Sequence, residues 1–190
     1  GRKGQKVAFV SERNDWSIRW DGLYVTEHVN RLRPNLARLT DNPAEPTGSI
    51  VHFGSQYMWA NWGPLLSSAN RYVVTYFHGK PEDGPDAARN VEEVLALLPR
   101  TEFVITAASA MECRLLEWGV PREKLVRIPI GVDTSRFVPV SSDGERLVAR
   151  QKFGIPADRL CIGSFQKDGV GWGDGSEPKL IKGPDIFIKA

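Results

Sequence analysis

Short, almost continuously apolar runs recur along this chain and alternate with segments of helical character. A strand that is apolar along its whole length has both faces buried, as in a parallel sheet covered on each side by helices. The pattern therefore predicts an α/β fold, Rossmann-like and doubly wound, with a mainly parallel sheet. The expected strands are Lys6–Val10, Ser49–Phe53, Arg71–Phe77, Glu102–Thr106, Leu125–Ile128 and Leu160–Phe165.

Amphipathic segments lie between these runs, and each has apolar residues at helical spacing. The expected helices are Gly22–Leu32, Ser55–Trp62, Ala87–Leu98, Ser109–Trp118 and Asp143–Phe153, with the first turns of another at Pro184–Ala190. Asp21 and Ser109 are expected to cap two of them. The stretch between Arg33 and Gly48 holds three prolines and is expected to be a loop. Ligands of such folds bind where the strands end at their carboxyl edge.

Composition excludes several classes of protein. The 190 residues are 41% hydrophobic and 25% charged, which is globular, and 25 basic against 23 acidic residues argue against a nucleic-acid partner. Cys113 and Cys161 form no metal or disulfide pattern, so we expect reduced, mostly buried thiols in a cytoplasmic protein. No Gly-x-Gly-x-x-Gly follows the first strand, which argues against a dinucleotide oxidoreductase.

The most informative segment runs from Phe103 to Pro139. Its second half contains Ile128-Pro129, then Gly131-Val132-Asp133, and then Phe137 and Pro139. This pattern resembles the signature of the glycosyltransferase family 4 enzymes, which have the GT-B fold. The family usually has Asn where this chain has Ile130.

A second match lies near Ala190. The family opens its second domain with a strand, Gly-Arg, a loop and then Lys-Gly at the start of a helix, and Lys182-Gly183 fits that step. Ser164 stands where the family often has Arg, and Lys167 is a candidate substitute cation. The resemblance implies a Rossmann-like acceptor-side domain at 1–155 and the beginning of a nucleotide-sugar-binding domain at 156–190.

The resemblance also implies a reaction. Members of the family transfer a sugar from a nucleotide-sugar donor with retention of configuration, without a metal or other cofactor. Their paired glutamates would lie beyond Ala190, so we expect a fragment that lacks most of the donor site and is inactive alone. A diphosphate leaving group needs cations and backbone donors, and Lys182 at a helix start supplies both. His78 ends a central strand, where the family has a His-Gly step facing the transferred sugar.

The loop after the first strand departs from the glycine-rich turn of many family members. Trp16 and Trp20 could stack on a sugar face, and Arg19 could bind an acidic acceptor group. Asp21 and Gly22 complete this candidate acceptor site, since Gly22 permits close approach at the helix start.

Glu12, Asp15, Asp21 and Asp133 could each act as a general base, but no spacing selects among them. The resemblance implies that the leaving diphosphate itself can take the acceptor's proton. His28 and His52 lack the context of His78 and are expected to be structural or surface residues.

Three points stay open at the level of sequence. The chain could instead be a non-catalytic domain that binds a glycan or a partner, or a GT-B-like sugar-nucleotide epimerase. The acceptor could be a glycan, a lipid carrier or a small molecule, and the oligomeric state is undetermined. Arg31, Arg33 and Arg38 could face the inner surface of a membrane as a peripheral contact.

Overall fold

The computed structural model describes residues 6–163 and 184–189. By its internal contacts the chain divides into two units between Ile130 and Gly131, and each is described by itself. The sheet and the candidate site both belong to the first unit. Where a second domain begins stays a prediction.

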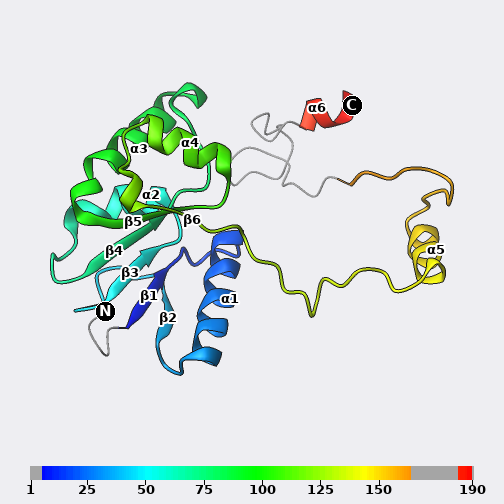
Figure 1. Cartoon of the computed structure of the whole chain (residues 1–190), viewed down its shortest axis with the longest axis horizontal. Helices are drawn as coiled ribbons and strands as arrows, with labels where there is room; N and C mark the ends of the chain where they lie inside the picture. Colours follow the sequence, from blue (N-terminus) through cyan, green and yellow to red (C-terminus); the bar gives the residue numbers. More distant parts are fainter. Residues whose placement is uncertain (1–5, 164–183, 190) are drawn as a thin grey trace. The chain divides into compact units, whose positions relative to one another are not determined.

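Six strands of the first unit form one parallel sheet, in the order β2-β1-β3-β4-β5-β6 (Figure 1). Their registers are continuous from Val7 opposite Ala37 to Thr106 opposite Arg127, with one irregularity at Tyr72/Val73. The predicted α/β fold with a parallel sheet is confirmed. The strands are β1 (Val7–Val10), β2 (Ala37–Thr40), β3 (Ile50–Phe53), β4 (Arg71–Thr75), β5 (Thr101–Thr106) and β6 (Leu125–Arg127).

Helices cover the two faces of this sheet unequally. Helix α1 contacts β1 and β2, whereas α2 contacts β3 and β4, and α4 contacts β5 and β6. The helices of the first unit are α1 (Ser17–Leu32), α2 (Gln56–Trp62), α3 (Pro85–Ala96) and α4 (Ser109–Glu117), with 3₁₀ turns at Gly63–Leu65, Pro81–Asp83, Leu98–Arg100 and Arg122–Lys124.

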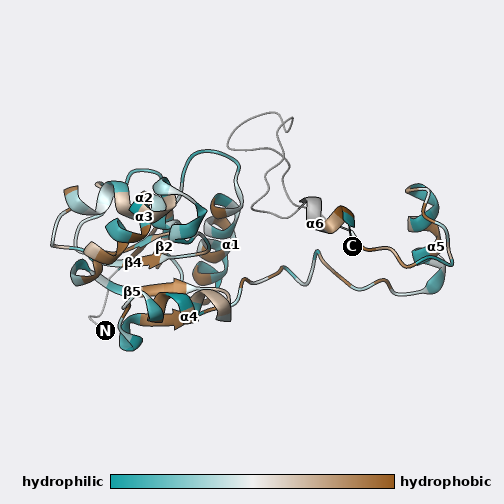
Figure 2. Ribbon diagram, turned by 90° about the horizontal axis from the view of Figure 1, so that it is seen from above, coloured by the Kyte–Doolittle hydropathy of each residue, from teal (hydrophilic) through white to brown (hydrophobic). Residues whose placement is uncertain are grey.

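The core lies between the sheet and α2, α3 and α4. Alternate strand residues point into it and are almost inaccessible, and Figure 2 shows strands β4 and β5 as strongly hydrophobic. Trp59 of α2 is fully buried, 5.0 Å from the ring of Tyr72 and 5.1 Å from that of Phe53. Such aromatic packing adds to the stability gained by burying the apolar area.

Helix α1 packs on the opposite face, against Phe9 and Leu39. Gly22 makes the close packing of this helix possible, because a Cβ there would lie 2.6 Å from Leu39 Cδ1 and 2.7 Å from Phe9 Cδ1. Gly54, at the end of β3, meets Ile18 of α1 in the same way. The helix therefore begins directly above the ends of β1 and β3.

Several sequence predictions need correction. The expected loop 33–48 contains β2, and α1 begins at Ser17 rather than Gly22, so Asp21 lies inside the helix and is not its cap. Ala108, not Ser109, occupies the cap position of α4. Residues 160–163 belong to no strand, and both cysteines are exposed rather than buried. A strand needs a hydrogen-bonded neighbour, and residues 160–163 have none in the described ranges.

The second unit contains two described helices, α5 (Asp143–Lys152) and α6 (Pro184–Lys189). Ser142 caps α5, since its hydroxyl oxygen accepts a 3.2 Å hydrogen bond from the Glu145 amide. Asp133, from the Gly-Val-Asp motif, accepts hydrogen bonds from the amide and hydroxyl of Ser135 and so closes a local turn. The predicted helix start at Pro184 is confirmed.

Candidate functional site

The order of the strands reverses its direction at one point of the sheet. The chain moves from β1 outward to β2 and then returns to place β3 on the other side of β1. Where the winding reverses in this way, the loops after the two strands diverge and leave room for a ligand at their carboxyl ends. The loops after β1 and β3 therefore define the candidate site, which we call the β1/β3 crevice (Ser11–Trp16 and Gly54–Gln56).

Glu12 lies in the first of these loops. Ser11, just before it, is fully buried and donates its amide to Thr40, while the Gly54 amide bonds to Val10. Burial raises the pKa of the Glu12 carboxyl, and its Oε2 is enclosed with no hydrogen-bond partner among the described residues. An enclosed polar atom without a partner costs free energy, so a ligand that supplies a donor would bind here favourably.

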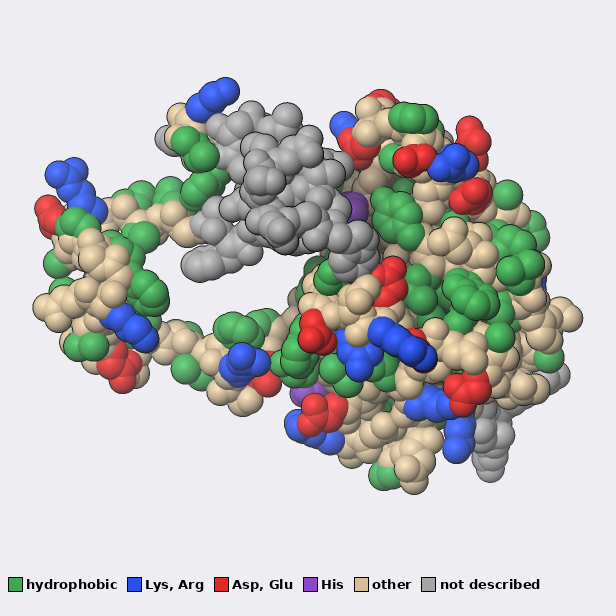
Figure 3. Space-filling view, turned by 180° about the vertical axis from the view of Figure 1, so that it is seen from behind, with side chains coloured by type: hydrophobic (Ala, Val, Ile, Leu, Met, Phe, Trp, Pro, Cys, Tyr) green, Lys and Arg blue, Asp and Glu red, His purple; other side chains and the backbone are tan. Residues whose placement is uncertain are grey.

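Basic side chains at this edge are already neutralised. Arg13 pairs with Asp41, which lowers the pKa of that carboxyl. Elsewhere along the carboxyl edge of the first unit, the same arrangement repeats within 4.0 Å: Arg19 with Asp15, Lys80 with Asp83, Arg89 with Asp86 and Arg127 with Glu112. Figure 3 shows acidic and basic side chains interspersed on the face that it presents. The edge offers paired charges rather than a cationic surface.

His78 lies in the loop after β4, which is the strand next to β3 and two strands from β1. Its side chain is exposed, and the buried amide of Gln56 donates a 2.8 Å hydrogen bond to its main-chain carbonyl. Parallel strands lie about 4.8 Å apart, so the ends of β1 and β4 are separated by ~10 Å. The structure thus brings His78 to the same edge as Glu12.

Two tyrosines line the approach to His78. The Tyr76 hydroxyl donates to the carbonyl of Gly79 at 3.4 Å, and Gly79 has φ +102°, a conformation that favours glycine. Burial, followed by the negative charge of Asp83, raises the pKa of Tyr57. Burial is also the main reason why the pKa of Tyr76 is raised. Both phenols therefore stay protonated at neutral pH. The buried Tyr76 already donates its proton to Gly79, whereas Tyr57, which is 42% exposed, can donate a hydrogen bond to a sugar hydroxyl.

The predicted acceptor residues are distributed over the first turns of α1. Trp16 is half-buried at the cap position, and Trp20 is 48% exposed with its ring 6.1 Å from that of Tyr24. Arg19 lies 3.9 Å from Asp15, and burial raises the pKa of Asp21. Gly22 is buried, and the close approach that it permits is that of α1 to the sheet, not that of a ligand to the helix. Trp20 is the more exposed of the two tryptophans at this edge.

Sequence reasoning missed Gln56 and gave Glu12 only as one of four possible bases. The signal for Gln56 was a polar amide shortly after a strand, at the start of a segment that is rich in aromatic residues. His52, by contrast, was expected to be structural. Its Nε2 lies 2.8 Å from the Thr75 hydroxyl, its ring packs edge-on against Phe9, and burial lowers its pKa to about 4. This geometry gives His52 a structural role.

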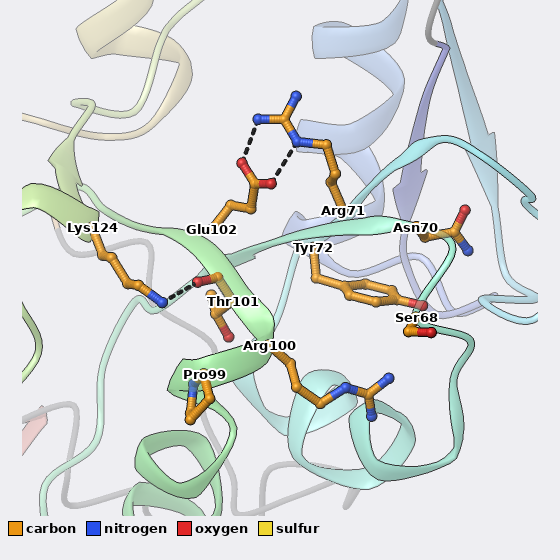
Figure 4. Close-up of a pocket in the computed structure, with 9 residues that line it drawn as sticks. All are labelled: Ser68, Asn70, Arg71, Tyr72, Pro99, Arg100, Thr101, Glu102 and Lys124. Carbon is orange, nitrogen blue, oxygen red and sulfur yellow. Dashed lines mark hydrogen bonds and ion pairs between the residues drawn. The ribbon is translucent and has the colours of Figure 1, made fainter.

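A hollow of about 530 Å³ opens at the opposite, amino edge of the sheet (Figure 4). Its basic groups serve the fold: Arg71 forms a double hydrogen bond to Glu102, and Lys124 donates to the carbonyls of Leu98 and Thr101 at 2.6 and 2.8 Å. Arg100 bonds the carbonyls of Gly63 and Leu66. These contacts tie the starts of β4 and β5 together.

The predicted donor-binding residues Ser164, Lys167, Lys182 and Gly183 lie outside the described residues. Within residues 6–163 and 184–189, no three His, Cys, Asp or Glu side chains gather where a metal ion could bind. None of the helices in the same ranges combines the length and apolarity needed to cross a bilayer.

Comparison with known proteins points to one activity class. No family model matches the chain. It is 27% identical over 159 residues to the D-inositol 3-phosphate glycosyltransferase of Stackebrandtia nassauensis, a match over 77% of this chain and 33% of that protein. It is 24% identical to a protein provisionally assigned as the colanic acid biosynthesis glycosyltransferase WcaL of Escherichia coli (strain K12), over 73% of this chain and 34% of that protein.

Solved structures give the same fold. The chain superposes on Anabaena Alr3699/HepE, solved with UDP and glucose, with a TM-score of 0.53 and 15% identity over 79% of this chain and 50% of that one. It spans about a third of the length of the curated relatives it matches and half of the structural neighbour. The resemblance that the motifs predict is thereby confirmed. This chain is related in sequence to two glycosyltransferases, and its fold matches about half of the HepE chain.

Proposed function

We propose that the chain is the acceptor-side part of a retaining glycosyltransferase that uses a nucleotide-sugar donor. The observation that carries the proposal is the sequence relationship to two glycosyltransferases over about three quarters of the chain. A carboxyl-edge crevice in the matching fold supports it, because ligands of open α/β sheets bind there. The HepE structures with UDP and with UDP-glucose make a uridine diphosphate sugar the first donor to test.

The reaction balances without an external reagent. The bond between the anomeric carbon and the donor diphosphate breaks, and a bond from the same carbon to an acceptor hydroxyl oxygen forms. The proton of that hydroxyl goes to the leaving diphosphate. His78 would bond a hydroxyl of the transferred sugar, while Lys182 and the backbone near Gly183 would hold the diphosphate, with Lys167 and Ser164 beside them.

Trp16 and Trp20 would pack on the acceptor, whose sugar faces are apolar. The acceptor is a glycan, a lipid-linked sugar or a small molecule. A cytoplasmic location is part of the proposal, as is a peripheral membrane contact through the arginines near the end of α1. Arg31 pairs with Glu27 and Arg38 pairs with Glu45, which weakens their attraction to an anionic membrane surface. The proposed membrane contact therefore depends mainly on Arg33.

The test uses the full-length protein with UDP-glucose and a panel of other nucleotide sugars. Products are identified by NMR, with and without sugar acceptors. We expect transfer with retained configuration, and we expect Lys182→Ala to reduce it strongly. Conversion of the nucleotide sugar without any acceptor would indicate an epimerase instead. Glycan binding in the absence of any donor binding would indicate a non-catalytic binding domain.

A further inference from the structure

The charges around the β1/β3 crevice restrict what can bind there. Every basic side chain named above at the carboxyl edge of the first unit lies within 4.0 Å of a carboxylate. Two carboxyls at the same edge, Glu12 and Asp21, have no ion pair among the described residues, and burial is the cause that raises the pKa of each. Glu12 and Asp21 therefore place two carboxyls that have no cationic partner among the described residues at this crevice, and Glu12 Oε2 also has no hydrogen-bond donor there.

We propose that the β1/β3 crevice selects an uncharged, hydroxyl-bearing acceptor, a sugar or polyol without a phosphate or carboxylate, and that Glu12 enforces this selection. The inference rests on the proposed function, because it names the substrate class of the same site.

Hydrogen bonding gives the attractive part of the selection. A carboxylate has about four lone-pair positions and accepts from hydroxyl groups. Glu12 Oε2 has no donor in the described part of the chain. The terminal torsion of a glutamate is broad, so a small rotation presents either oxygen to a ligand. An acceptor hydroxyl then satisfies an atom that is otherwise enclosed without a partner, and hydrogen bonds to a charged group are the stronger ones.

Charge gives the repulsive part. A phosphate placed beside Glu12 would meet a carboxylate and would find Arg13 and Arg19 already close to Asp41 and Asp15. Like charges brought together in a partly enclosed site repel each other, and specificity often depends on such repulsion. The arginine that the sequence suggested for an acidic acceptor group, Arg19, thus has an acidic neighbour within this chain.

The first experiment measures binding alone. The full-length protein is titrated by NMR with glucose, mannose, galactose and myo-inositol, each compared with its monophosphate. We expect neutral compounds to bind at least ~10-fold more tightly than their phosphates. Equal or tighter binding of the phosphates overturns the inference, and so does the absence of binding by every neutral compound.

The second experiment assigns the selection to Glu12. Glu12→Gln keeps the shape and removes the charge, so it should bring the ratio of neutral to phosphorylated affinity toward one. Glu27→Gln, which removes an exposed carboxylate of α1, is the matched control and should leave the ratio unchanged. If both variants keep the wild-type ratio, Glu12 is not the selecting group and the inference fails.

A transfer assay separates this inference from the proposed function. With a donor present, neutral acceptors should be glycosylated and their phosphates should not. If the neutral compounds bind selectively but no nucleotide sugar binds or reacts, the crevice assignment stands and the transferase proposal is lost. If transfer occurs preferentially to phosphorylated acceptors, the transferase proposal stands and the present inference is wrong.

Discussion

The side-chain amide of Gln56 donates a hydrogen bond of 2.8 Å to the main-chain carbonyl of His78. Gln56 is the first residue of α2 and only 2% exposed, whereas His78 lies in the loop after β4 with its side chain in solvent. A buried amide thus holds the backbone of an exposed, candidate functional residue. The contact joins the loop after β3 to the loop after β4.

Replacing Gln56 with Leu should destabilise the first unit. The substitution keeps a similar volume but removes the donor to a partly buried carbonyl, which costs about 1–3 kcal/mol. Urea denaturation followed by tryptophan fluorescence measures the change. Gln151→Leu, at an exposed position of α5, should leave the midpoint nearly unchanged. An unaltered midpoint for the Gln56 variant would show that the bond contributes nothing to stability.

A methyl group at Gly22 should destabilise the protein although alanine is the better helix former. Its Cβ would lie 2.6–2.8 Å from side-chain atoms of Leu39 and Phe9, so α1 must move away from the sheet. Overpacking of this kind costs roughly 1–3 kcal/mol, against a propensity gain of about 1 kcal/mol. We expect Gly22→Ala to lower the melting temperature.

Gly144→Ala in α5 is the control for that substitution. The nearest atom to its Cβ would be the Ser142 hydroxyl oxygen at 3.7 Å, an ordinary contact. Here only helix propensity acts, so the helical circular dichroism signal should hold or rise. If Gly22→Ala proved equally harmless, the close packing of α1 on β1 and β2 would be wrong.

Several features of the fold were readable from the sequence, because their cause is local. Arg71–Phe77 and Glu102–Thr106 predict strands since continuous apolar runs suit a sheet buried on both faces. The edge strand β2 has half-exposed residues between prolines and lacks that signal. The start of α1 was missed for a similar reason: Ser17, Arg19 and Asp21 interrupt its apolar spacing before Gly22.

The candidate site was only partly predictable. His78 stands out because it ends a central strand, which is a local property. Whether Glu12 has a cationic partner depends on pairings across the fold: Arg13 is its neighbour in sequence, yet it pairs with Asp41, 28 residues further along. No spacing rule reveals such a choice. The exposure of Cys113 is likewise set by which face of α4 meets the core.

Stability should fall between pH 6.5 and pH 4 because of His52. Its pKa is lowered by burial to about 4, whereas an unfolded histidine titrates near 6.5. The unfolded chain therefore binds the proton first as the pH falls, so stability is unaffected above pH 6.5 and decreases toward pH 4. The loss amounts to roughly 3 kcal/mol, from the 1.36 kcal/mol that corresponds to one pKa unit.

Urea midpoints measured from pH 7.5 to pH 4 test this dependence. His52→Phe should flatten the profile across that window, since it removes the titrating group while keeping an aromatic ring beside Phe9. His28→Gln, at an exposed position of α1, should leave the profile as steep as in the wild type. A His52→Phe profile as steep as the wild-type one would assign the pH dependence to other groups.

Both thiols should react in the native state. Cys113 and Cys161 are exposed, so Ellman's reagent should modify two thiols per chain without denaturant. The variants Cys113→Ser and Cys161→Ser should each remove one. Reaction of either thiol only after unfolding would show that it is buried, as the sequence alone suggested.

Substitution of His78 should separate a functional from a structural role. The bond to Gln56 uses the main-chain carbonyl of His78, so His78→Ala should keep that contact. If His78 bonds the transferred sugar in the transition state, kcat for glycosyl transfer should fall by ~100-fold with a smaller change in KM. His28→Ala, at an exposed position of α1, serves as the control and should retain activity. A wild-type kcat for the His78→Ala protein would show that His78 is not part of the site. A loss of activity that parallels a loss of circular dichroism signal would instead assign His78 a structural role.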